Sequence, residues 1–412
     1  MSAYVCRFCA APLQLTFCDL GMSPLSNANL RPEQLQAAEK FYPLHSYVCE
    51  HCWLVQLPEH ETPDHIFGQD YAYFSSYSDS WLAHCKAYCE LMIQRFGFGP
   101  ASQVVEIASN DGYLLQYFKA RGVPVLGVEP AANCAAVAQA KGIPSLVRFF
   151  GVKTAQELRD SGRSADLLLG NNVLAHVPDI NDFVVGLKVA LKPSGIVTME
   201  FPHLLQLISH NQFDTIYHEH YSYLSLLAVR GIFARHGLIL FDVQELQTHG
   251  GSLRVYARHA EDDSKPVAAA VGGLLTRETA AGLGGTAVYR RFEQQVQETR
   301  YKLLEFLIRA KREGKRVWGY GAPAKGNTLL NYCGIRRDLV QGTVDRSPHK
   351  QGLYLPGTHI PVYAPEKLSE VKPDYVLILP WNLKEEIMRQ AAYIRGWGGR
   401  FVVPIPQVQV IA

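Results

Sequence analysis

The sequence predicts an α/β protein of three parts, in which a small metal-binding segment precedes two doubly wound units. Two Cys-x-x-Cys pairs lie within residues 1–60. Strand-like and helix-like runs then alternate over residues 101–200, and again over residues 313–412. Such alternation is typical of a parallel sheet covered by helices. At 412 residues the chain is too long for one hydrophobic core. We therefore predict domains over residues 1–70, 71–235 and 236–412.

The overall composition argues against two classes of partner. The net charge is +2 and no long run of Lys or Arg occurs, whereas a nucleic-acid protein needs a basic surface. No apolar stretch reaches the roughly 18 residues that a membrane span needs, and the first residues do not resemble a signal peptide. We expect a cytoplasmic monomer that binds neither nucleic acid nor membrane.

The first predicted element is a zinc site. Cys6 and Cys9 form one pair, and Cys49 and Cys52 form a second pair further along the chain. Two such knuckles can supply four thiolates to one tetrahedral zinc ion without an open coordination position, so the ion is expected to be structural. Cys18 and His51 are spare candidates. The alternative is four unrelated buried thiols.

The central unit follows an aromatic, hydroxyl-rich segment at residues 70–78, which either lines a ligand pocket or packs as a linker. A helix is expected over residues 79–96. The expected strands of the central unit are residues 103–108, 125–128, 165–169 and 196–200, and the helices between them are residues 113–120, 131–140 and 180–191. Ligands of such sheets bind at the carboxyl ends of the strands.

Three of these strand ends together predict a site for S-adenosylmethionine. The first carries a loop of small residues, Glu106–Gly112, which is neither a Gly-x-Gly-x-x-Gly turn nor a P-loop. The second ends at Glu129, placed to accept the ribose hydroxyls, although helix capping is the alternative. The third carries Asn-Asn-Val-Leu-Ala-His-Val. The expected cofactor residues are Glu106, Ala108, Asn110, Asp111, Gly112, Glu129, Pro130, Asn171, Asn172, Val173 and His176.

The densest group of proton-active side chains is the run Phe-Asp-Thr-Ile-Tyr-His-Glu-His-Tyr-Ser-Tyr at residues 213–223. It lacks the His-Glu-x-x-His spacing of zinc proteases. In a strand His218 and His220 would share a face, whereas a loop leaves their directions open. We interpret the run as an acid/base centre, the alternative being that the histidines are structural core residues. A helix at 224–235 and a hairpin around residues 248–252 follow.

The second doubly wound unit comes after a long charged helix at residues 289–313. Its expected strands are residues 316–320, 340–344, 375–381 and 401–403. The turn Gly-Ala-Pro-Ala-Lys-Gly-Asn-Thr enters a helix, and small residues with Lys325 at a helix N-terminus suit an anion such as a diphosphate. A vestigial fold that binds nothing is the alternative. The expected substrate residues are Tyr73, His249, Lys325, Asn327, Asp345 and Arg346.

Taken together, these motifs resemble the sugar C-methyltransferases of deoxysugar biosynthesis over essentially the whole chain. The resemblance rests on the two knuckles and on the motifs Glu-Ile-Ala-Ser-Asn-Asp-Gly, Asn-Asn-Val-Leu-Ala-His-Val, Tyr-His-Glu-His-Tyr-Ser-Tyr, His-Gly-Gly-Ser-Leu-Arg and Gly-Tyr-Gly-Ala-Pro-Ala-Lys-Gly-Asn. It implies a zinc domain, a central domain that binds S-adenosylmethionine and a C-terminal Rossmann-like domain. It also implies methylation at C3 of a dTDP-linked 4-keto-6-deoxy sugar. The implied acid/base residues are Tyr217, Glu219 and His220, with His220 the base, and Tyr71 approaches the sugar.

Three other functions fit parts of the sequence. A zinc-ribbon nucleic-acid methyltransferase is disfavoured by the near-neutral charge, and a nucleotide-sugar oxidoreductase by the absent Gly-x-Gly-x-x-Gly motif. A non-catalytic sensor would not need the His/Glu/Tyr cluster. For the C-methyltransferase we expect His220 to remove the C3 proton with a pKa near neutral. Glu219 would then hold its tautomer, and a tyrosine hydroxyl would stabilise the enolate.

Overall fold

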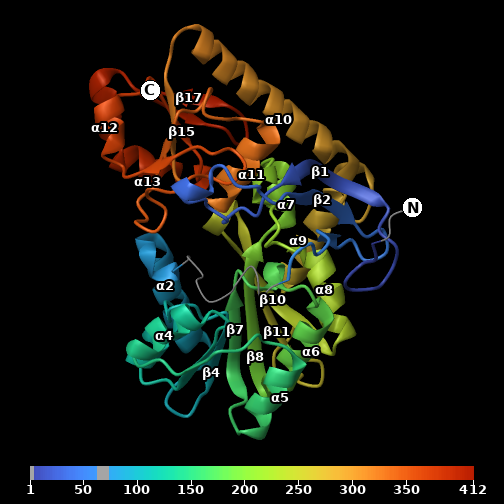
Figure 1. Cartoon of the computed structure of the whole chain (residues 1–412). Helices are drawn as coiled ribbons and strands as arrows, with labels where there is room; N and C mark the ends of the chain where they lie inside the picture. The colour runs from blue at the N-terminus through green and yellow to red at the C-terminus, as the bar shows by residue number, and fades with distance from the viewer. Residues whose placement is uncertain (1–3, 63–73) are drawn as a thin grey trace.

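The computed structural model describes residues 4–62 and 74–412. They form two lobes with the N-terminal segment against their junction (Figure 1). The lower lobe holds a seven-stranded sheet in the order β10-β11-β8-β7-β4-β5-β6. Its strands are β4 (Val104–Ile107), β5 (Val125–Val128), β6 (Ser145–Leu146), β7 (Ala165–Asn171), β8 (Leu191–Pro202), β10 (Leu238–Leu246) and β11 (Ser252–His259).

The strand order reverses between β4 and β7, which start the two halves of the sheet. A reversal of this kind leaves a crevice at the carboxyl ends of the two strands, where ligands bind in such sheets. Strands β10 and β11 pair antiparallel and join the sheet through β8, so the sheet extends past the predicted boundary at residue 235. The helices of this lobe are α2 (Asp79–Phe96), α3 (Leu115–Ala120), α4 (Ala132–Ala140), α5 (Val152–Asp160), α6 (Ile180–Ala190), α7 (Leu204–Ser209), α8 (Leu226–Arg235) and α9 (Ala269–Ala280).

The upper lobe holds a six-stranded sheet in the order β14-β13-β12-β15-β16-β17. Its strands are β12 (Val317–Tyr320), β13 (Thr343–Val344), β14 (Val362–Tyr363), β15 (Tyr375–Ile378), β16 (Arg400–Val403) and β17 (Gln409–Ile411), and its helices are α10 (Ala287–Arg312), α11 (Ala324–Cys333), α12 (Lys367–Val371) and α13 (Lys384–Gln390). All pairs of neighbouring strands are parallel except β16 with β17, which are antiparallel. The sequence analysis did not predict β17. The order reverses between β12 and β15, so this sheet has its own crevice.

The N-terminal segment supplies three strands of a third, four-stranded sheet in the order β1-β2-β3-β9. Its strands are β1 (Leu15–Ser23), β2 (Tyr42–Val48), β3 (Val55–Gln56) and β9 (Ser222–Tyr223). Strand β1 continues to Ser23, and a loop leads from it to η1 (Pro32–Gln34). The segment shares a core with the upper lobe, where Phe17 stacks on Phe292 of α10 at 4.6 Å between ring centroids.

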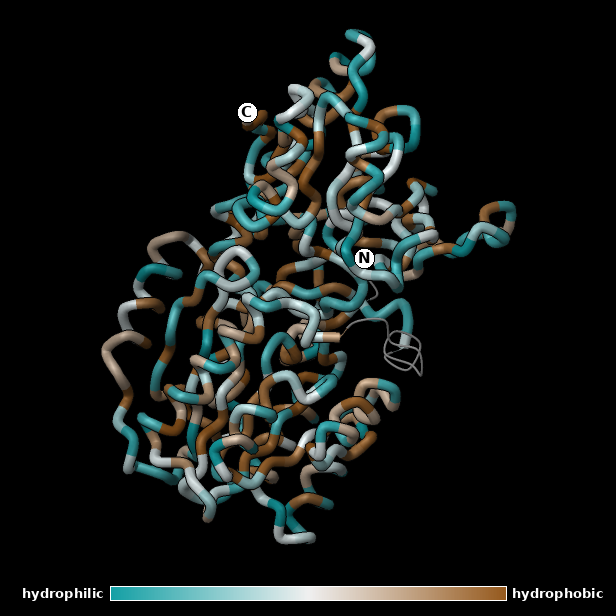
Figure 2. The backbone as a smooth tube through the Cα atoms, turned by 90° about the vertical axis from the view of Figure 1, so that its left-hand side faces the viewer, coloured by the Kyte–Doolittle hydropathy of each residue, from teal (hydrophilic) through white to brown (hydrophobic). Residues whose placement is uncertain are grey.

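Short 3-10 helices complete the description: η1 (Pro32–Gln34), η2 (Ser75–Tyr77), η3 (Leu174–His176), η4 (Phe213–Thr215), η5 (Thr248–Gly250), η6 (Trp381–Leu383) and η7 (Ala392–Trp397). Apolar residues, brown in Figure 2, run through the interior of both lobes. Within the described ranges, no helix combines the length and apolarity needed to cross a lipid bilayer.

Candidate active site

The two cysteine pairs form matching turns that converge. In each pair the first cysteine's carbonyl accepts the N–H four residues later, from Ala10 and from Trp53. Both of these residues have φ of +61°, so the backbone turns back sharply after each pair. The Sγ atoms of Cys6, Cys9, Cys49 and Cys52 all lie within 4.8 Å of one another. Tetrahedral Zn–S bonds of about 2.3 Å separate sulfurs by about 3.8 Å, so these four thiols fit a zinc ion.

The spare zinc candidates lie elsewhere. Cys18 is fully buried in β1, and His51 is exposed. Neither belongs to the cluster of possible ligands found among the described residues. The two knuckles alone can complete a tetrahedral site, which leaves no open position for chemistry.

The loop after β4 brings its backbone into the crevice of the lower sheet. Ala108, Asn110 and Gly112 all have positive φ, a conformation that coils the main chain tightly. A Cβ on Gly112 would lie 2.5 Å from Ile143 Cδ1, so a larger side chain would not fit there. Glycine at position 112 therefore allows the loop to pack closely against Ala138 and Ile143.

Glu129 holds this loop in place. One carboxylate oxygen accepts the N–H of Asn110 and the other accepts the N–H of Ala131, both at 2.8 Å. Helix capping, the alternative role of Glu129, would account for the bond to Ala131 but not for the bond to Asn110. Burial raises the pKa of Glu129, and the two N–H donors lower it. Each oxygen keeps a second lone pair for a ribose hydroxyl.

Several buried polar atoms in the loops after β4 and β7 have no hydrogen-bond partner among the described residues. They include Asp111 Oδ1, Asn171 Nδ2 and Asn172 Oδ1. Buried polar atoms are almost always satisfied, so unpaired ones gathered at a strand switch point indicate a polar ligand. Together with the small-residue loop after β4 and with Glu129, these atoms are suited to bind S-adenosylmethionine.

Replacing Glu129 with glutamine is expected to weaken binding of S-adenosylmethionine roughly 10- to 100-fold, the range for a lost charge-assisted hydrogen bond. The amide NH₂ would face an N–H donor, which would displace the loop after β4. Isothermal titration with S-adenosylmethionine measures the effect. Glu157→Gln, on the exposed face of α5, is the matched control. Equal affinities of the two variants would contradict the assignment.

The run at residues 213–223 is a helical turn and a β-turn, with β9 only at its end. The N–H of His220 bonds to the carbonyl of Tyr217, which closes the β-turn at 2.9 Å. The two histidines therefore diverge. His218 lies against Tyr42 and His60 of the N-terminal segment, with ring centroids 5.8 and 6.2 Å away. His220 lies 4.0 Å from the Tyr217 ring, measured between centroids.

Two hydrogen bonds join this turn to the loop after β7, at the edge of the lower sheet where the cofactor is expected to bind. The N–H of Tyr221 donates to the carbonyl of Ala175, and His176 Nδ1 bonds to the carbonyl of Glu219, both at 2.8 Å. Burial lowers the pKa of His176 to about 4, so its ring is neutral and Nδ1–H is the donor. The loop after β7 thus carries predicted cofactor residues and also supports the turn at residues 217–220, which we call the acid/base turn after its predicted role.

The imidazole of His220 has a defined tautomer. Its Nδ1 lies 2.9 Å from the carbonyl oxygen of Thr215, which can only accept, so Nδ1 carries the proton and Nε2 the lone pair. The expectation that Glu219 holds this tautomer is wrong. Burial and the nearby His176 lower the pKa of His220 well below its usual range, rather than leaving it near neutral as expected. At physiological pH the ring is therefore neutral, the form that a base requires.

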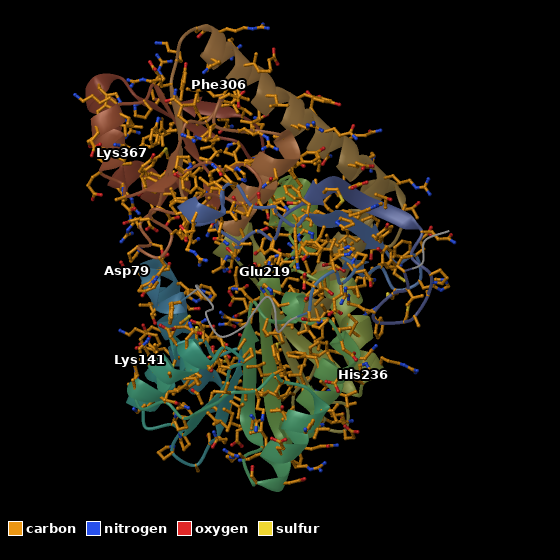
Figure 3. All side chains as sticks on the ribbon, in the orientation of Figure 1. Asp79, Lys141, Glu219, His236, Phe306 and Lys367 are labelled. Carbon is orange, nitrogen blue, oxygen red and sulfur yellow. The ribbon has the colours of Figure 1, made fainter. Side chains whose placement is uncertain are left out.

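The Glu219 side chain turns towards the N-terminal segment. Its Oε1 accepts a hydrogen bond of 2.5 Å from Asn27 Nδ2. Burial raises the pKa of Glu219 to about 7, against the opposing effects of Asn27 and of the Lys350 charge. A carboxyl group with such a pKa can exchange a proton near neutral pH. Figure 3 shows Glu219 at the level where the two lobes meet.

Asp214 and Trp381 are site residues that the sequence analysis missed. Asp214 is fully buried and accepts a hydrogen bond of 2.7 Å from Trp381 Nε1, directly after β15. Burial raises the pKa of Asp214 to about 7, and the charge of Lys325 lowers it. The signal in the sequence was the position of Trp381 at the end of a strand beside the switch point of the upper sheet.

Lys325, at the start of α11, lies close to Asp214 and Trp381. Its Nζ bonds to Asn382 Oδ1 at 2.8 Å and lies 4.7 Å from the centroid of the Trp381 ring. Its charge is close enough to lower the pKa values of both His220 and His249. The upper lobe therefore brings the Lys325 charge close to His220.

The remaining predicted substrate residues have different surroundings. His249 has φ of +54°, and its Nε2 lies 2.9 Å from the amide nitrogen of Asn172, so it reaches the cofactor edge. Asp345 repeats the arrangement of Glu129, because it accepts the N–H of Ala322 in the loop after β12. Arg346 is exposed, 3.8 Å from Glu386. Tyr71 and Tyr73 lie outside the described residues.

A pocket of about 380 Å³ lies beside the site, between the β10–β11 hairpin and the segment after β15. Trp381 and Asn382 form part of its wall, and of the predicted catalytic residues that the structure describes, Tyr217, Glu219 and His220, none lines it.

Comparisons with known proteins match all three parts of the chain. Family models described as a zinc binding domain, a methyltransferase domain and a C-methyltransferase C-terminal domain match residues 6–67, 81–242 and 247–406. The C-methyltransferase NovU of Streptomyces niveus is 37% identical over 407 residues, 99% of this chain and 96% of that protein. The chain belongs to this family of C-methyltransferases.

More distant relatives match a smaller share of the chain. A ubiquinone biosynthesis O-methyltransferase of Azorhizobium caulinodans is 28% identical over 26% of this chain and 46% of its own length. A solved S-adenosylmethionine-dependent methyltransferase from Mesorhizobium loti covers 43% of this chain at 15% identity with a TM-score of 0.35.

The predicted fold class, enzyme class and cofactors of this C-methyltransferase are confirmed. It combines a zinc-binding N-terminal domain, a central methyltransferase domain that uses S-adenosylmethionine and a C-terminal α/β domain. The roles of individual site residues remain predictions.

Proposed function

We propose that this C-methyltransferase methylates C3 of a dTDP-linked 4-keto-6-deoxy sugar through an enolate formed by a base. The observation that carries the proposal is the His220 imidazole. It is neutral, it is oriented by the Thr215 carbonyl, and hydrogen bonds fix its turn to both lobes. The motif resemblance and the relationship to NovU support a sugar substrate.

The order of events follows from the chemistry of carbon. A carbon atom becomes nucleophilic when it loses a proton, and a neighbouring ketone makes this possible by taking up the charge as an enolate. S-adenosylmethionine, when bound by Glu129 and the loops after β4 and β7, supplies an electrophilic methyl group. The protein must therefore remove a proton and stabilise an oxyanion.

His220 is suited to remove the proton at Nε2. Its lowered pKa keeps it unprotonated, and the negative charge that develops on the enolate stabilises the imidazolium as it forms. The Thr215 carbonyl accepts from Nδ1–H in both protonation states, so the ring keeps its direction throughout.

Other residues are candidates to stabilise the oxyanion and to bind the nucleotide. The Tyr217 ring lies against His220, so its hydroxyl is a candidate donor to the enolate oxygen, with Tyr71 as a second candidate. Lys325, at the start of α11, is the cation for the diphosphate, and Asn327, Asp345 and Arg346 are candidates for the rest of the nucleotide. Tyr73 and His249 are candidates for contact with the sugar.

Incubation with S-adenosylmethionine and a panel of dTDP-, GDP- and CDP-linked 4-keto sugars tests the proposal. We expect a mass gain of one methylene on a dTDP-linked sugar, and carbon NMR should place the new methyl group at C3. Transfer to a hydroxyl oxygen, or to none of these sugars while S-adenosylmethionine binds, would contradict it.

A further inference from the structure

Asn27 of the zinc-binding domain lies at the acid/base turn. It belongs to the loop between β1 and η1, far from residue 219 in the sequence. Its Nδ2 lies 2.5 Å from Glu219 Oε1. The Asn27 residue is exposed and Glu219 is buried, so the amide covers the carboxyl group on its solvent side. No motif of the sequence marked this residue.

The loop that carries Asn27 is fastened to the upper lobe. The buried amide of Asn327, in α11, donates to the carbonyl of Ser26 at 2.6 Å. Leu30 and Tyr354 exchange two backbone hydrogen bonds of 2.8 Å. These bonds lie on either side of Asn27 in the sequence. They therefore restrict the main chain at Asn27 and the position of its side-chain amide.

We propose that Asn27 is a positioning residue for Glu219, which it orients and keeps ionised for the acid/base chemistry. The inference rests on the proposed function, with Glu219 as one of its predicted acid/base residues. An N–H donor stabilises a carboxylate and not a carboxylic acid O–H, and such charge-assisted bonds are about twice as strong as neutral ones. The zinc-binding domain would then complete the active site as well as support the fold.

The other groups that face Glu219 cannot replace this amide. Lys350 acts on it through its charge, and the Lys350 ammonium itself bonds to the carbonyl of Ala322 at 2.7 Å. His176 bonds to the Glu219 main-chain carbonyl and not to its carboxyl. Tyr221 lies near enough for the Glu219 charge to raise its pKa, and its hydroxyl donates to the carbonyl of Glu61. Among the described residues, Asn27 is thus the side chain that donates to the carboxyl group.

Asn27→Ala and Asn27→Asp test the inference in the full-length zinc protein. We expect kcat for methyl transfer to fall roughly tenfold or more in Asn27→Ala, with the affinity for S-adenosylmethionine unchanged. The rising limb of the pH profile, set by ionisation of Glu219, should move to higher pH because the carboxylate loses its donor. Asn27→Asp should move it further, because two carboxyl groups would then face each other. Asn29→Ala, in the same loop, is the matched control.

A second measurement separates this inference from the proposed function. Carbon NMR of protein labelled at the glutamate carboxyl carbons follows the titration of Glu219 without any substrate, with Glu219→Gln to assign the signal. A higher pKa in Asn27→Ala than in the parent supports the inference. An unchanged pKa, or an active parent whose pH profile is unaffected by Asn27→Ala, would overturn it. An inactive parent with the expected NMR shift would count against the proposed sugar chemistry alone.

Discussion

His220→Asn is expected to abolish both methyl transfer and the exchange of the substrate C3 proton with deuterated water. The asparagine amide can still bond to the Thr215 carbonyl, but it has no basic nitrogen at the position of Nε2. A positioned general base contributes about 10²–10⁴-fold to rate, so both activities should fall by at least that range. Proton NMR in deuterated water measures the exchange, and mass spectrometry measures the transfer.

The comparison with His218 makes this experiment specific. His218→Asn is the same substitution two residues away, on a side chain that faces Tyr42 and His60 of the N-terminal segment. It should leave exchange measurable, and both variants should still bind S-adenosylmethionine. Exchange at the parent rate in His220→Asn would remove this residue from the role of base.

The fold could be predicted where local signals were strong. Helix α2 begins and ends as expected, because the Ser78 side chain caps its first turn and Gly97 ends it with a left-handed residue. Strand β7 is buried along nearly its whole length, which gives the continuous apolar run that marks a central parallel strand. The spacing of the four cysteines was sufficient to predict their convergence.

The site was predicted less completely, because several of its contacts depend on the main chain or on distant segments. The acceptor for His220 is the carbonyl of Thr215, and any residue could have supplied it. Asn27 and Trp381 reach the run at residues 213–223 from two other domains. Residue types within one segment reveal neither contact. The prediction that Glu219 orients His220 failed because the β-turn directs the two side chains apart.

The zinc site is joined to the acid/base turn by a short structural path. Strand β3 follows Cys52 and pairs with β9. Gln56 of β3 lies opposite Ser222 of β9. Gln56 also accepts the N–H of Arg7, which lies between Cys6 and Cys9. Strand β9 begins two residues after His220. Loss of the ion should therefore disturb His220, the predicted base, even though the zinc ion is expected to be structural.

We expect Cys49→Ala to lose the zinc ion, to unfold at a markedly lower temperature and to lose most methyl transfer. Structural zinc sites in small domains are worth about 10–16 kcal/mol in apparent binding free energy, so few proteins could tolerate this loss unchanged. Elemental analysis, thermal melting and the methyl-transfer assay measure the three effects. Cys89→Ala, on the buried side of α2 and outside the knuckles, should keep one zinc ion per chain. A Cys49→Ala protein without zinc but with parental activity would show that the path through β3 and β9 does not support the base.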